Sequence, residues 1–221
     1  MGTYSSILII LLVYAIILLS IVTIHRIRPG IGLYEKRRPG DLSWLAIFYV
    51  TNIALMSVPT LFIAHVPAHL LIFPEKINVD QAIAFLLTWI LISILPWRKF
   101  SVQFPIEILS SHGEIYLYAI SRLLFLACYE WFFRGLLLYS CRDLFGSPAA
   151  VVINISLYAL AHFHKCRKEI VACIPFGLLL CVFTLWWHSV WPAIILHVLV
   201  VTVSEWPPLQ QFISSQKQTA L

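Results

Sequence analysis

Residues 7–24 read ILIILLVYAIILLSIVTI, a run without a single charged side chain. At 1.5 Å per residue, a helix of this length is about long enough to cross the ~30 Å hydrocarbon core of a bilayer. The whole chain has 221 residues, of which 61% are hydrophobic and 11% charged. A water-soluble domain of this size cannot hide so much apolar surface. We therefore expect an all-α polytopic membrane protein.

Further apolar runs follow the first, and together they predict about seven transmembrane helices. Proline, glycine and basic residues separate the runs, as is typical of helix ends and loops. In chain order, the predicted spans are Ile7 to Ile24, Trp44 to Ala64, Gln81 to Leu95, Tyr116 to Cys141, Pro148 to Phe163, Ile170 to Trp187, and Trp191 to about Glu205.

The basic residues predict the orientation of the chain in the membrane. There are 15 Lys and Arg against 10 Asp and Glu, and they gather in short segments between the apolar runs, at 26–38, 98–99 and 165–168. Loops rich in Lys and Arg stay on the cytoplasmic side. This places the N-terminus outside and the C-terminus in the cytoplasm, and the short loops favour a bacterial inner membrane. The positive charge does not gather beside a soluble fold, so we expect no nucleic-acid partner.

The cysteines carry no signal of a metal site or a disulfide framework. They show neither CxxC spacing nor a paired pattern. We expect all five to be reduced and packed in the helix bundle: Cys128, Cys141, Cys166, Cys173 and Cys181.

Polar residues inside the predicted spans are few. An ionisable group there costs about 2.5–3.5 kcal/mol on insertion scales, so each requires a partner or a function. Glu130 and Arg134 are four residues apart, in the order that favours an ion pair on one helix face. Asn154, Tyr158 and His162 recur at four-residue intervals and predict one polar stripe on the next span.

His197 is the one polar side chain in the apolar stretch 192–201 of the last span. Each of these features alone has a structural explanation: mutual neutralisation of Glu130 and Arg134, or a hydrogen bond made by His162 or His197. Taken together, a carboxylate and two imidazoles on three different spans are the parts of a site that activates water by general base and stabilises an oxyanion.

The order and spacing of three segments resemble the motifs of the CPBP family of intramembrane proteases. The segments are Tyr129-Glu130-Trp131-Phe132-Phe133-Arg134-Gly135, Tyr158-Ala159-Leu160-Ala161-His162, and His197 after Trp191-Pro192-Ala193-Ile194-Ile195-Leu196. The family motifs are EExxxR, FxxxH and HxxxN or HxxxD, and its members include CAAX prenyl endopeptidases and bacteriocin-processing or immunity proteins. The resemblance divides the chain into N-terminal helices and loops (1–115), a protease core (116–206) whose four spans form a bundle, and a tail (207–221).

The resemblance implies an intramembrane endopeptidase that hydrolyses a peptide bond of a membrane-anchored peptide or protein, in contact with the lipid bilayer and without a cofactor. By position, Glu130 matches the second glutamate of the first motif. We predict that it is the general base, and that His162 is its partner or a ligand of the water molecule. His197 is the expected oxyanion stabiliser, and Arg134 holds Glu130.

The sequence departs from the family motifs at two positions. Tyr129 stands where the first glutamate is expected, and Val201 stands where Asn or Asp follows the last histidine. Either Glu130 swings in as the base, or hydrolysis has been lost and the protein acts in immunity or as a scaffold. Tyr129 is unattractive as a base because its reference pKa is near 10. Asn154, or Glu205 two turns after His197, is a candidate replacement for the missing amide.

Two other mechanisms use the same groups. Glu130, His162 and His197 could hold zinc with an open coordination position, and intramembrane charges also serve proton-coupled transporters. Any shared site requires His162 and His197 to lie at similar depth. The predicted spans instead place them near opposite ends of their helices.

Overall fold

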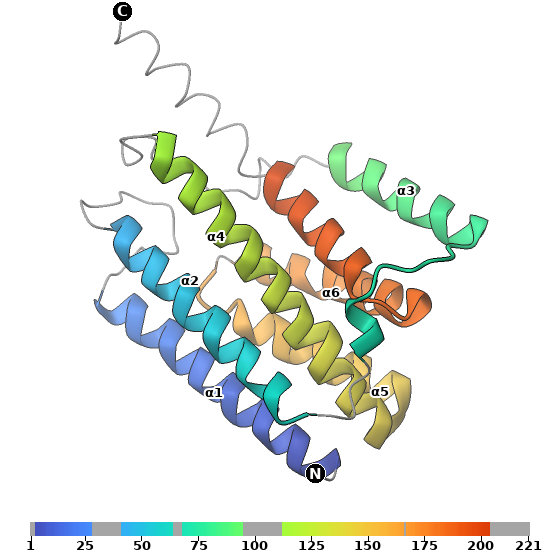
Figure 1. Cartoon of the computed structure of the whole chain (residues 1–221), viewed down its shortest axis with the longest axis horizontal. Coiled ribbons are helices and arrows are strands. Elements are labelled where there is room, and N and C mark those ends of the chain that lie inside the picture. Colours follow the sequence, from blue (N-terminus) through green and yellow to red (C-terminus); the bar gives the residue numbers. More distant parts are fainter. Residues whose placement is uncertain (1–2, 28–40, 64–67, 95–111, 166, 204–221) are drawn as a thin grey trace, which may run out of the picture.

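A computed structural model of the protein describes residues 3–27, 41–63, 68–94, 112–165 and 167–203, and this part of the chain contains helices and no strands (Figure 1). The α-helices are α1 (Thr3–Ile27), α2 (Asp41–Ser57), α3 (Val79–Ile94), α4 (His112–Glu130), α5 (Leu138–Ala161), α6 (Arg167–Trp187) and a last helix, Trp191–Val203. Two 3-10 helices, η1 (Val58–Leu61) and η2 (Ala68–Leu71), and one π-helix, η5 (Trp131–Leu137), complete the described elements.

Three stretches of helix in the described part are long and apolar enough to cross a membrane: Tyr4–Ile24, Ala119–Ala161 and Arg167–Trp187. Ile47–Leu61, Val79–Ile94 and Trp191–Val203 are shorter apolar helices. These findings confirm the predicted helical class and its membrane character. The count of seven spans stays a prediction.

The structure corrects one predicted boundary. The span predicted from Trp44 to Ala64 is an α-helix only as far as Ser57, because Pro59 lies in the first turn of η1 and has no N–H for a continuing α-helix. Ala64 lies outside the described residues.

The break expected between the fourth and fifth spans is present. Gly146 has φ +78° and ψ 165°, so α5 is two helical segments joined by a kink, and Pro148 follows in the first turn of the second segment. This backbone conformation is essentially restricted to glycine. The fourth span itself is not one regular helix, since α4 ends at Glu130 and η5 separates it from α5.

The helices bury two apolar clusters. In the first, α2 lies between α1 and α4, while α5 covers α1 from behind (Figure 1). The second joins α3, α6 and the last helix through Ile92, Leu180, Phe183, Ala193 and Leu196. Tyr129 belongs to the first cluster, and His197 is on a helix of the second. The side chains at the contact between α4 and the last helix therefore lie where the two apolar clusters meet.

The outer faces of the bundle are apolar. Large aliphatic side chains on α1, α3, α4 and α6 are exposed, as a lipid environment requires, and they include Leu8, Leu19, Leu87, Leu124, Val171 and Leu178. Cys128, Cys141, Cys173 and Cys181 are free thiols, as expected, and Cys166 lies outside the described residues.

Candidate active site

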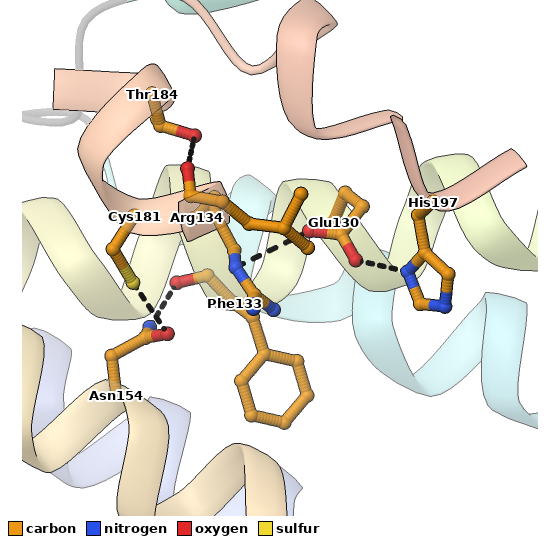
Figure 2. A network of polar contacts seen from close by, with 8 residues as sticks. Glu130, Phe133, Arg134, Asn154, Cys181, Thr184 and His197 are labelled. Carbon is orange, nitrogen blue, oxygen red and sulfur yellow. Dashed lines mark hydrogen bonds and ion pairs between the residues drawn. The ribbon is translucent and has the colours of Figure 1, made fainter. Parts of the chain in front are cut away.

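Glu130, the last residue of α4, is the centre of a buried polar network (Figure 2). Its Oε1 accepts a hydrogen bond of 2.5 Å from Nδ1 of His197, on the last helix. Its Oε2 lies 3.3 Å from Nε of Arg134, and neither of these two side chains is exposed. The ion pair predicted from the four-residue spacing is therefore confirmed, and the carboxylate has a second partner that sequence spacing did not predict.

Arg134 is enclosed by aromatic side chains and by α6. Its guanidinium carbon lies 4.2 Å from the centre of the Tyr158 ring, which is cation–π distance. Gly177 of α6 allows the close approach, because a Cβ atom at this position would lie 3.2 Å from Tyr158 Cδ1 and 3.5 Å from Arg134 Nη2. Burial makes the loss of either charge costly, since the remaining ion would be buried without its counter-ion.

Asn154 holds the π-helix that carries Arg134. Its Nδ2 donates a 2.6 Å hydrogen bond to the carbonyl of Phe133, and its Oδ1 accepts from the thiol of Cys181 at 3.3 Å (Figure 2). The backbone N–H of Leu138 bonds the same Phe133 carbonyl. Both polar atoms of the amide thus join α5 to η5 and α6. π-Helical turns are rare and occur frequently at functional sites.

His162 follows the last residue of α5 and lies in the turn between two apolar helices. Its Nδ1 is 2.8 Å from the carbonyl of Tyr158. A carbonyl only accepts, so Nδ1 carries the proton and Nε2 of the neutral ring has a free lone pair.

Tyr129 contacts both histidines. The centre of its ring lies 6.2 Å from that of His162 and 5.9 Å from that of His197, and both contacts are edge-on. Tyr158 also contacts both imidazoles, at 4.8 Å and 6.4 Å. Because the two histidines share the same two tyrosine neighbours, they lie in the same part of the bundle.

The two histidines differ in their relation to the carboxylate. His197 binds Glu130 directly, whereas His162 bonds the backbone of its own helix, and the described residues contain no hydrogen bond between His162 and Glu130. No three His, Cys, Asp or Glu side chains of the described part gather so as to hold a metal ion.

The structure also shows neighbours that sequence reasoning did not place in the site. Phe176 packs edge-on against His197, at 5.7 Å between ring centres, and Tyr129 is a neighbour of both imidazoles. Gly177 carries a signal in the sequence, because small residues in membrane helices mark close helix contacts. Val201 is partly buried in the last helix, and Glu205 lies outside the described residues.

Comparison with known proteins identifies the region that contains these residues. The sequence model described as type II CAAX prenyl endopeptidase Rce1-like matches residues 111–203. The match supports the resemblance of this region to the CPBP family. The matched region includes α4, η5, α5, α6 and the last helix, so it contains every residue of the network around Glu130. No curated protein and no solved structure matches the chain significantly.

Proposed function

We propose that this protein is an intramembrane endopeptidase that hydrolyses a peptide bond of a membrane-anchored peptide or protein. One observation carries the proposal: a buried carboxylate, Glu130, binds the imidazole of His197 beside a second imidazole, His162. The match of residues 111–203 to a protease family agrees with this chemistry.

The hydrogen bond between Glu130 and His197 supports catalytic roles that differ from those expected from the sequence. Both carboxylate oxygens of Glu130 face a partner, so Glu130 holds and polarises His197 rather than contacting water itself. The Nε2 atom of His197 is left to accept a proton. A carboxylate that fixes the orientation of an imidazole and stabilises the imidazolium is an effective base.

His162 is suited to binding the attacking water. With its proton on Nδ1, its Nε2 accepts one hydrogen of water while Nε2 of His197 removes the other. The water oxygen then attacks the substrate carbonyl carbon, and the proton held on His197 passes to the leaving amine when the C–N bond breaks. No metal ion or cofactor takes part in this scheme.

The membrane context supplies the substrate class. A site enclosed by lipid-exposed helices is reached by peptides that are themselves anchored in the bilayer. We place the chain in a bacterial inner membrane with seven spans, the N-terminus outside and the C-terminus in the cytoplasm. The protease core is the four-span bundle of residues 116–206, between the N-terminal helices (1–115) and the tail (207–221).

Reconstituted protein tests this function directly. The protein is placed in lipid vesicles with a library of peptides that share an apolar C-terminal anchor, in water enriched in oxygen-18. We expect a new carboxyl terminus carrying one oxygen-18 atom, which is absent with the His197→Ala variant. Intact peptides throughout the library, with folded protein, would exclude the endopeptidase.

A second candidate is a catalytically impaired CPBP protein that acts in immunity or as a scaffold. The presence of Tyr129 and Val201 at two motif positions favours it. In that case Glu130→Gln leaves the cellular phenotype intact, whereas a bulky substitution that blocks helix packing abolishes it.

A further inference from the structure

The hydroxyl group of Tyr129 is buried without a hydrogen-bond partner among the described residues. The residue is 7% exposed, and its ring contacts those of Phe125 on α4 and Phe133 on η5. A buried hydroxyl without a partner costs free energy. In a polar cluster, a hydroxyl without a protein partner indicates that a bound ligand supplies the hydrogen-bond partner.

The surroundings of Tyr129 show what that ligand would be. Its ring contacts His162 and His197, the two imidazoles of the proposed reaction. Its hydroxyl lies close enough to Glu130 and Arg134 to interact with their charges. A peptide carbonyl attacked by water between the imidazoles would therefore lie next to a phenol.

The proposed reaction needs such a hydrogen-bond donor. The free Nε2 atoms of His162 and His197 act as acceptors, so neither can donate to the oxyanion while water is being activated. Val201 has no polar side chain. Arg134 has free N–H groups, but Figure 2 shows it on the side of Glu130 away from His197. Its guanidinium carbon lies 4.2 Å from the centre of the Tyr158 ring.

The geometry points to Tyr129 as the residue that donates a hydrogen bond to the carbonyl oxygen of the scissile peptide bond, and this inference rests on the proposed endopeptidase function. The phenol keeps its proton throughout. As the water oxygen bonds the carbonyl carbon and the C=O electron pair moves onto oxygen, the O–H dipole stabilises the new negative charge. Tyr129 thus supplies the function of the amide that the family motif places at position 201.

Tyr129→Phe removes only the hydroxyl, and Tyr139→Phe is the matched control. Tyr139 is equally buried, but its hydroxyl donates to the carbonyl of Thr184 at 3.5 Å, and it lies outside the site. We expect Tyr129→Phe to lower kcat about 10²- to 10³-fold with an unchanged KM. Tyr139→Phe keeps the wild-type kcat.

Melting temperature gives a second readout that does not need activity. Tyr129→Phe should melt at or above the wild-type temperature, because it removes an unpaired polar group, whereas Tyr139→Phe loses a hydrogen bond and melts lower.

Wild-type kcat in Tyr129→Phe would overturn the inference and leave the endopeptidase intact. If the wild type cleaves no peptide, the endopeptidase fails. In that case the melting temperature still tests whether the Tyr129 hydroxyl is kept unpaired for a ligand. A lowered melting temperature of Tyr129→Phe would overturn this assignment, and an unchanged or raised one would support it.

Discussion

Oε1 of Glu130 and Nδ1 of His197 are 2.5 Å apart, although the two residues are separated by 67 positions in the sequence. The contact joins the end of α4 to the last helix, and so connects the two apolar clusters of the bundle. It also leaves one imidazole nitrogen of His197 for chemistry. We therefore expect the stability and the proposed activity to depend on the same pair of residues.

Removing the charge of Arg134 should unfold the site. Arg134→Ala leaves Glu130 as a buried carboxylate without its cation, and we expect a loss of about 3–5 kcal/mol in the free energy of unfolding. The matched control is Arg142→Ala, which breaks the partly exposed pair with Asp143 and should cost about 1 kcal/mol or less. Chemical unfolding in detergent measures both. Equal losses in the two variants would contradict the burial argument.

A methyl group at position 177 should disturb the site from the side of α6. Gly177→Ala places a Cβ atom 3.2 Å from Tyr158, so the ring must shift against Arg134. We expect a loss of about 1–3 kcal/mol in stability together with reduced kcat. Leu178→Ala, at a lipid-exposed neighbouring position, should leave kcat unchanged. Wild-type kcat in Gly177→Ala would show that this close approach has no role in the site.

Gly146 sets the kink that turns α5 back along the bundle. No atom lies within 4 Å of a Cβ built at this position, so substitution is opposed only by the backbone conformation. Gly146→Ala should cost about 1–3 kcal/mol in stability. Gly146→Asn should cost a similar amount, because ψ of 165° lies outside the left-handed helical region that asparagine tolerates. If Gly146→Asn were as stable as the wild type, the result would contradict the backbone conformation of Gly146 described here.

Two buried asparagines allow a paired test of the π-helix. Asn154 bonds the Phe133 carbonyl in η5, whereas Asn52 bonds the Phe48 carbonyl on its own helix. Both Asn→Ala changes should cost about 1–3 kcal/mol in stability. Only Asn154→Ala should also lower kcat, because it releases the segment that positions Arg134. The prediction fails if the two variants retain the same kcat.

The sequence was sufficient for the helices because apolar runs and helix stops are local. The run that ends at Trp187 and the break before Pro148 appear in the structure where the sequence places them. The π-helix after Glu130 was not predicted, since it depends on a hydrogen bond between Asn154 and a carbonyl 21 residues earlier in the chain. The 3-10 turn after Ser57 could have been predicted from Pro59.

The same distinction applies to the site. The ion pair between Glu130 and Arg134 follows from helical spacing within one segment and was predicted. The bond from Glu130 to His197 depends on how two distant helices pack, and no local pattern encodes it. The sequence offers Tyr129 only as an unfavourable base, whereas its position against both imidazoles suggests a donor.

The most direct test of the account is a double-mutant cycle on kcat with Glu130→Gln, His197→Gln and the double variant. If carboxylate and imidazole act as one base, each single change lowers kcat about 10²- to 10⁴-fold, and the double variant is no slower than the slower single variant. Wild-type activity in either single variant, or losses that multiply in the double variant, would contradict a shared role for Glu130 and His197.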